Sequence, residues 1–169
     1  MSRVLLREAV AEDAEILAEL VRNSFEEYRG LLQPPSGGHS ETAESIRTKL
    51  ETGWALIASV DGQAAGCVFY EPAGENIYLH RLGVLPAFRE SGVGRTLVKA
   101  VETRAKEGGY KGIRLGTRIV LTKNRAFYER LGYRLVGYGE RLWQGEPFYV
   151  VYEKRFELPV TGNQDETEG

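Results

Sequence analysis

The stretch VLPAFRESGVGRTLVKAVE, residues 84–102, constrains the fold of this chain more than any other. Two glycines, Gly92 and Gly94, separate a predicted strand, broken by Pro86, from a predicted helix. The apolar residues of this helix recur at helical spacing and predict one buried face: Val93, Leu97, Val98, Val101 and Ala105. Four charged residues are expected to face away from it: Lys99, Glu102, Lys106 and Glu107. The stretch therefore predicts a strand, a tight turn and an amphipathic helix.

The same turn is a candidate phosphate site. The first N–H groups of a helix lack intrahelical partners, and together with the helix dipole they bind anions. Glycine lets a ligand approach the backbone, and Arg89 adds a cation just before the turn. The dinucleotide signature fails because its third glycine would stand at Leu97, and no Gly-Lys-Ser/Thr follows. A nucleotide-binding module is therefore disfavoured, and another phosphorylated ligand is expected.

The order of elements predicts a mixed α/β sheet in a single domain, residues 1–158, followed by a disordered polar tail, residues 159–169. A second helix is expected to begin at Ser40 as its N-cap, and Asp61-Gly62 favours a hairpin turn. The expected strands are 3–10, 54–60, 63–72, 76–84, 111–117, 133–142 and 146–156, and the other expected helices are 11–30 and 124–132.

Composition narrows the classes of function. Lys and Arg number 22 against 24 Asp and Glu, so a basic face for nucleic acid is not expected. The single cysteine, Cys67, excludes an intramolecular disulfide and a thiolate zinc site. The chain shows no signal peptide and no apolar run that could cross a bilayer. We therefore expect a cytoplasmic protein that contacts neither membrane nor nucleic acid.

Two motifs resemble one known family. RESGVG, residues 89–94, resembles the Arg/Gln-x-x-Gly-x-Gly/Ala signature of the GNAT superfamily, the acetyl-CoA-dependent N-acetyltransferases, and VLP precedes it as in that family. NRAFYERLGYR, residues 124–134, resembles the second family motif and follows in the correct order. The resemblance implies a mixed, mostly antiparallel twisted sheet of six to seven strands, flanked by about four helices, with splayed central strands.

The resemblance also implies cofactor-binding residues for acetyl-CoA, and no metal. Backbone N–H groups of the turn would hold the CoA pyrophosphate, from Arg89, Glu90, Ser91, Gly92, Val93, Gly94, Arg95 and Thr96. The pantetheine arm would pair with the strand before the turn, beside Leu82, Gly83 and Val84. Asn124 matches the motif asparagine that contacts the cofactor. The side chain of Glu90 is expected to point outward.

Two catalytic roles follow from the same resemblance. The N–H of Leu82 would stabilise the tetrahedral oxyanion, and the Tyr128 hydroxyl would protonate the leaving thiolate. Many members carry a glutamate as general base where this chain has Tyr78.

The general base is left open among Tyr78, His80, Glu71, Glu75 and a water chain. His80 is a suitable proton acceptor and shares strand parity with Tyr78 and Leu82, so these three are expected on one face.

The resemblance implies an N-acetyltransferase that moves the acetyl group of acetyl-CoA directly to a primary amine of a small molecule or peptide. A non-catalytic acyl-CoA-binding or sensing domain is the alternative, since the usual glutamate is missing at Tyr78. The loop 31–40, with His39, either lines the acceptor site or is solvated. The acceptor, the acyl group and the choice between monomer and homodimer stay open.

Overall fold

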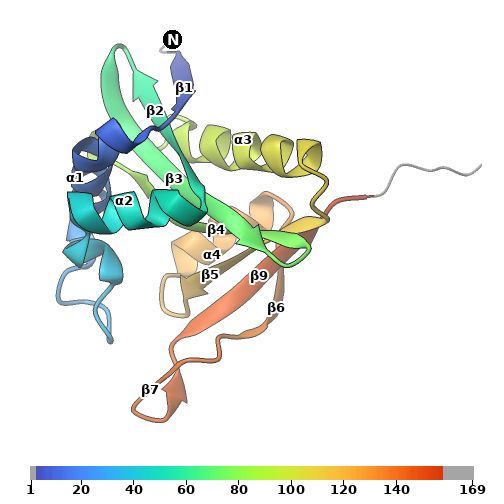
Figure 1. Ribbon diagram of the computed structural model, residues 1–169. Helices are drawn as coiled ribbons and strands as arrows, with labels where there is room; N and C mark the ends of the chain where they lie inside the picture. The colour runs from blue at the N-terminus through green and yellow to red at the C-terminus, as the bar shows by residue number, and fades with distance from the viewer. Residues whose placement is uncertain (1–2, 158–169) are drawn as a thin grey trace, which may run out of the picture.

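The computed structural model describes residues 3–157, so the predicted tail lies outside the described residues. A seven-stranded sheet has the order β1-β2-β3-β4-β5-β9-β6 and is antiparallel except between β4 and β5 (Figure 1). Its strands are β1 (Val4–Glu8), β2 (Trp54–Val60), β3 (Gln63–Ala73), β4 (Asn76–Val84), β5 (Gly112–Arg118), β6 (Arg134–Tyr138) and β9 (Tyr149–Arg155). A small hairpin pairs β7 (Leu142–Trp143) with β8 (Glu146–Pro147). The predicted mixed, mostly antiparallel sheet is confirmed.

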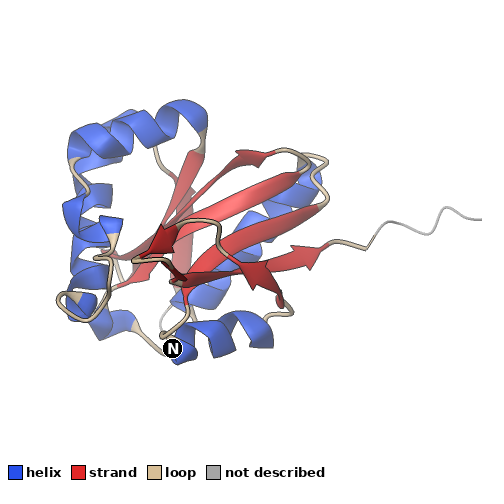
Figure 2. Ribbon diagram, turned by 90° about the horizontal axis from the view of Figure 1, so that it is seen from below, coloured by secondary structure: helices blue, strands red, loops and turns tan. Residues whose placement is uncertain are grey.

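Helices cover the sheet on both sides (Figure 2). They are α1 (Ala14–Phe25), α2 (Ala43–Thr52), α3 (Val93–Glu107) and α4 (Thr122–Arg130). Short 3₁₀ turns occupy Ala11–Asp13 (η1), Glu26–Tyr28 (η2), Gly37–Ser40 (η3) and Pro86–Phe88 (η4). Among residues 3–157, no helix is long and apolar enough to cross a membrane.

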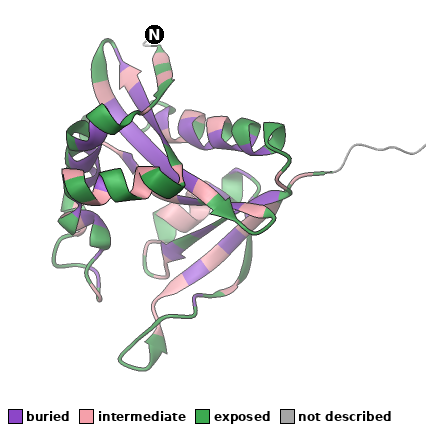
Figure 3. Ribbon diagram, in the orientation of Figure 1, coloured by how far each residue is buried: buried purple, intermediate pink, exposed green. Residues whose placement is uncertain are grey.

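The strands alternate their side chains between two cores. One core packs α1 and α2 against β2 and β3, with Leu17, Val21, Ile46, Ile57 and Phe69 at its centre. The other packs α3 and α4 against the opposite face, with Leu97, Val101, Ile113, Leu115 and Tyr152 at its centre. Burial is concentrated in the middle of the sheet and falls toward β6 and β7 (Figure 3). The predicted apolar stripe of α3 is confirmed.

The prediction that Ser40 caps the second helix is wrong. Ser40 closes the η3 turn, and the chain becomes extended only at Glu41, so the next residue, Thr42, is the N-cap. Thr42 Oγ1 accepts a hydrogen bond from the Ser45 N–H at 3.1 Å, and Ser45 Oγ accepts from the Thr42 N–H at 2.8 Å. The reciprocal pair begins the helix two residues later than expected.

The prediction that Glu102 faces solvent is also wrong, because it is only 4% exposed. The Tyr133 hydroxyl donates to its Oε2 at 2.9 Å, and Lys154 Nζ lies 3.3 Å from both carboxylate oxygens. Lys154 also donates to the carbonyl of Leu131 at 2.8 Å. The residues after α4 and strand β9 therefore cover this edge of α3 with a phenol and a cation that satisfy a buried carboxylate.

The central strands separate soon after they meet. The parallel ladder between β4 and β5 joins Asn76 to Gly112, Ile77 to Ile113 and Tyr78 to Arg114. Beyond these pairs, residues 79–84 and 115–118 have no ladder with each other. The splay implied by the family resemblance is therefore present, and it leaves the β5-facing edge of β4 without a strand partner.

Candidate active site

A bulge in β4 sets the direction of the side chains at the splay. Phe69 pairs with His80, but Cys67 pairs with Gly83, so β4 carries one extra residue at this point. Arg81 takes up the bulge with a positive φ of 52°. Two consecutive side chains, His80 and Arg81, consequently lie on the face covered by α1 and α2.

The bulge makes one sequence prediction wrong. Tyr78 and His80 share a face and stack with ring centroids 5.2 Å apart, as predicted. Leu82 was expected on the same face, yet it packs against the core beneath α3 because the bulge reverses the alternation. The side chains of Leu82 and His80 therefore lie on opposite faces of the sheet.

The glycines of the turn have separate structural reasons. Gly92 is the N-cap of α3 and has a φ of 88°, a left-handed conformation that favours glycine. A Cβ on Gly94 would lie 3.4 Å from the ring of Phe127 on α4, so this glycine lets the two helices approach closely. The N–H groups of Val93, Gly94 and Arg95 have no intrahelical acceptor by helix geometry. The start of α3 is thus a set of free donors beside α4.

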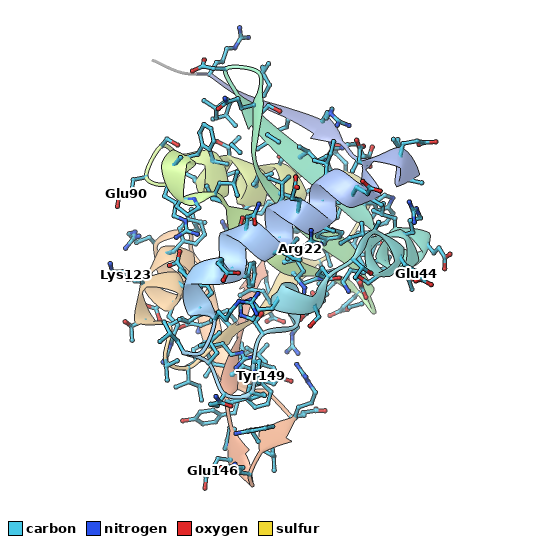
Figure 4. All side chains as sticks on the ribbon, turned by 90° about the vertical axis from the view of Figure 1, so that its left-hand side faces the viewer. Arg22, Glu44, Glu90, Lys123, Glu146 and Tyr149 are labelled. Atoms are coloured by element: carbon cyan, nitrogen blue, oxygen red, sulfur yellow. The ribbon has the colours of Figure 1, made fainter. Side chains whose placement is uncertain are left out.

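Arg89 was expected to add a cation just before the turn, but its guanidinium group is bonded within the protein. Its Nη1 pairs with Glu27, its Nη2 donates to the Ser24 carbonyl at 2.9 Å, and its Nε donates to the Val84 carbonyl at 2.9 Å. The guanidinium therefore ties the turn to the ends of α1 and β4. Glu90 is exposed and points outward, as predicted (Figure 4).

Three tyrosines and an asparagine gather beside the splay. Tyr128 on α4 is only 8% exposed, and burial raises the pKa of its hydroxyl, with Tyr28 and Tyr78 raising it further. Burial also raises the pKa of Tyr28, while the side chain of Asn124 lies against that phenol and lowers it. The site therefore draws on α4, η2 and β4. Sequence reasoning missed Tyr28, because it lay inside the expected helix 11–30, whereas α1 ends at Phe25 and Tyr28 closes the η2 turn.

The structure separates the candidate bases. His80 Nε2 lies 3.2 Å from Glu71 Oε1 on the neighbouring strand. Burial lowers the pKa of His80 to about 4, with the charges of Arg81 and Lys49 lowering it further. Glu75 lies at the β3–β4 turn instead, paired with Lys111 at 3.7 Å and Arg155 at 3.2 Å. Glu71 and His80 thus come together, and Glu75 is directed elsewhere.

Cys67 is buried, and burial raises the pKa of its thiol to about 12, so it is not an activated nucleophile. Within residues 3–157, no group of three His, Cys, Asp or Glu side chains is placed to hold a metal ion. The expectation that no metal is needed remains a prediction.

Two curated relatives are similar in sequence to this chain over about three fifths of its length. The chain is 31% identical over 107 residues to Probable N-acetyltransferase 14 of Xenopus tropicalis. This alignment covers 62% of this chain and 50% of that protein. It is 34% identical over 118 residues to the protein of the same name from Danio rerio, covering 60% and 42%. The chain spans about half the length of the curated relatives it matches.

Solved structures share the fold. The PaiA N-acetyltransferase from Thermoplasma acidophilum, in complex with coenzyme A, aligns with a TM-score of 0.78 at 21% identity, covering 91% of this chain and 99% of that one. The ribosomal-protein-S18-alanine N-acetyltransferase from Escherichia coli aligns with a TM-score of 0.74 at 13% identity, covering 95% and 98%. The acetyltransferase (GNAT) family matches residues 17–133, more than half of the 169 residues. The chain therefore belongs to the acetyltransferase (GNAT) family.

Proposed function

We propose that this domain, residues 1–158, transfers the acetyl group of acetyl-CoA directly to a primary amine of a small molecule or peptide. The observation that carries the proposal is the buried Tyr128, whose hydroxyl pKa is raised by burial, beside strands that separate after Tyr78. Family membership and a structural relative crystallised with coenzyme A support it. We expect the protein to act in the cytoplasm, as a monomer or homodimer, without nucleic acid.

The start of α3 would hold the cofactor pyrophosphate. Free N–H groups and the positive end of the helix dipole favour an anion here, and the space next to Gly92 is open. Of the turn residues proposed from the sequence, Arg89 and Ser91 have side chains bonded within the protein, so their backbone groups would contribute. Asn124 on α4, whose side chain contacts the Tyr28 phenol, would also contact the cofactor.

The free edge of β4 would receive the pantetheine arm beside Leu82, Gly83 and Val84. This edge has no ladder with β5, so an extended ligand could pair with its backbone, although the Val84 carbonyl already accepts a hydrogen bond from Arg89. We assign the Leu82 N–H to the oxyanion that forms when the amine nitrogen attacks the thioester carbonyl.

Tyr128 would supply the proton that the leaving sulfur requires. A raised pKa keeps its hydroxyl protonated at neutral pH, which is the state a general acid needs. As the carbon–sulfur bond breaks, the phenol donates to the thiolate, so free CoA leaves as a thiol.

We assign proton removal from the amine to His80, oriented by Glu71. Nε2 lies 3.2 Å from a carboxylate oxygen of Glu71, which would leave Nδ1 as the acceptor on the ring. Burial keeps the imidazole neutral at pH 7, so it is available although weakly basic. The pair replaces the glutamate that many family members carry at the position of Tyr78.

A screen of amines with detection of released thiol tests the proposal. The expected result is thiol release from acetyl-CoA that matches the amount of N-acetylated amine by mass spectrometry. Calorimetry should show acetyl-CoA binding in the same preparation. Binding without thiol release for any amine would overturn the proposal and favour a non-catalytic acyl-CoA sensor.

A further inference from the structure

The sheet beyond β4 has one face that the helices leave open. Along β5, Ile113, Leu115 and Thr117 are buried toward α3, so Arg114, Gly116 and Arg118 lie on the opposite face. Helices α1 and α2 lie over β2, β3 and β4 and leave this part of the sheet uncovered (Figures 1 and 2).

Two arginines meet on this open face without an acidic partner. The Arg118 Cζ lies 4.9 Å from the centroid of the Phe148 ring, and the Arg141 Cζ lies 5.4 Å from the same centroid. Arg141 also lies 5.1 Å from the ring of Tyr149, the residue that pairs with Arg118 across the ladder. Within residues 3–157, neither guanidinium has a carboxylate at ion-pair distance.

Arg81 differs from Arg118 and Arg141 because it has an acidic partner. It lies on β4, across the splay from β5, and its Nε donates to Glu41 at 2.7 Å. Glu41 also pairs with Lys49 at 3.1 Å, so one carboxylate serves two cations. The face of the sheet that carries His80 and Arg81 therefore has an excess of positive charge at the splay.

Buried polar atoms without partners lie at the same place. Arg118 Nη1 and both ring nitrogens of His39 are inaccessible to solvent and have no hydrogen-bond partner. Burial lowers the pKa of His39, the charges of Arg29 and Arg118 lower it further, and the Glu26 carboxylate raises it, so His39 and Arg118 lie within electrostatic reach. Leaving such groups unpaired costs folding free energy. Buried polar groups without partners are therefore rare, and those that exist are often found where a ligand binds. Arg118 as a whole is only half-buried and Arg141 is exposed, so a ligand that accepts hydrogen bonds can reach this pair of guanidinium groups.

We propose that Arg118, with His39 and Arg141, binds a carboxylate carried by the amine acceptor. The proposal rests on the proposed function for the amine and names the class of molecule that bears it. The acceptor is then an amine that also carries a carboxylate, such as an amino acid or an acidic peptide. An acceptor bearing only cations, such as a polyamine, is repelled by the unpaired guanidinium groups.

Proximity supports the same assignment. Burial raises the pKa of Tyr78, which stands where β4 and β5 separate. Arg81 and Arg141 lower this pKa and Tyr149 raises it, so all three lie close to Tyr78. The carboxylate subsite is therefore next to the stacked pair of Tyr78 and His80, on the face where the amine must lose its proton. The start of α3, which would hold the cofactor pyrophosphate, belongs to the helix layer on the opposite face of the sheet. The carboxylate subsite and the pyrophosphate site therefore need not be occupied by the same molecule.

The first experiment compares amino acids with their carboxamides in the thiol-release assay. Wild type should have a KM lower for the acid than for the amide by about 10- to 150-fold, the range expected for hydrogen bonds to a charged group. Arg118→Gln should raise the KM for the acid by that factor and leave the amide unchanged. Arg114→Gln is the matched control, because Arg114 lies on the same strand face and already pairs with Glu153. Equal effects of Arg118→Gln on acid and amide would overturn the subsite.

The second experiment measures binding without turnover. N-acetylated amino acids are titrated into the CoA-saturated protein by calorimetry, alongside peptides with an acidic side chain and an amidated C-terminus, which distinguish the two sources of carboxylate. Wild type should bind one of these probes and Arg118→Gln should not. If they bind in this way while no amine releases thiol, the subsite stands and the proposed function fails. If neutral amines release thiol and no carboxylate probe binds, the function stands and the subsite is wrong.

Discussion

Replacing His80 by glutamine should make the protein more resistant to acid. The buried imidazole, whose side chain is 14% exposed, has its pKa lowered to about 4, whereas the unfolded chain has the ordinary value near ~6.5. Between these values the unfolded chain binds the proton and the folded chain does not. Stability is therefore lost as the pH falls from 6.5 toward 4.

The size of the effect follows from the two pKa values. At pH 5 the unfolded state gains about thirtyfold in relative population, which is about 2 kcal/mol, while at pH 7.5 the effect is close to zero. Glutamine keeps a polar side chain of similar size and does not titrate. Relative to wild type, His80→Gln should gain about 2 kcal/mol on going from pH 7.5 to pH 5, or about 4–8 °C in Tm.

Urea unfolding at the two pH values measures this difference directly. Arg47→Gln, on the exposed face of α2, is the control and should show the same pH dependence as wild type. A pH dependence of His80→Gln that equals that of wild type would refute the neutral, buried imidazole. The assignment of His80 as proton acceptor would then lose its electrostatic basis.

Three further substitutions and one double variant test the glycine turn and the buried carboxylate beside α3. Gly92→Val and Gly109→Val introduce a side chain into open space at positive φ, at opposite ends of α3, and each should cost at least about 1–2 kcal/mol. Only Gly92→Val should lose acetyl-CoA affinity in calorimetry, and equal affinities would contradict the pyrophosphate site. Lys154→Met should destabilise the fold by about 3 kcal/mol in chemical unfolding, because Glu102 stays buried with only Tyr133 and the more distant Lys99. The double variant Lys154→Met with Glu102→Gln should recover most of this loss, and a double variant as unstable as the single one would show that charge burial is not the cause.

The sequence predicted what depends on local pattern. The spacing from Val93 to Ala105 gave the buried stripe of α3, and the glycine turn gave its start. The two family motifs implied the splayed sheet. Each of these signals lies within one element or within one strand–turn–helix unit, where periodicity and turn chemistry are reliable guides.

The wrong predictions concern residues whose positions depend on contacts with elements far away in the sequence. The alternation of side chains along a strand predicted Leu82 on the same face as His80, but an extra residue at Arg81 breaks that alternation. None of the residue types at this point indicates a bulge. Glu102 is charged and still buried, because Lys154 reaches it from a strand 52 residues away. Arg89 looked free because Glu27, its partner, lies on a distant turn.

The acceptor side could not be predicted for the same reason. Tyr28, His39, Arg118 and Arg141 come from separate connections and strand ends, and they acquire a common role only when the sheet brings those ends together. Segments of this kind vary most within a fold, so the motifs that indicate the cofactor say nothing about the amine.

The most direct test of the account is the rate of thiol release by Tyr128→Phe. The substitution removes one oxygen from a buried ring and keeps its packing against Phe127 and Tyr133. Tyr110→Phe, beyond the far end of α3, is the matched control and should leave the rate unchanged. Tyr128→Phe should lower kcat by about ten- to a hundredfold or more, with acetyl-CoA affinity nearly intact. An unchanged kcat would contradict proton donation by Tyr128 and with it the central claim.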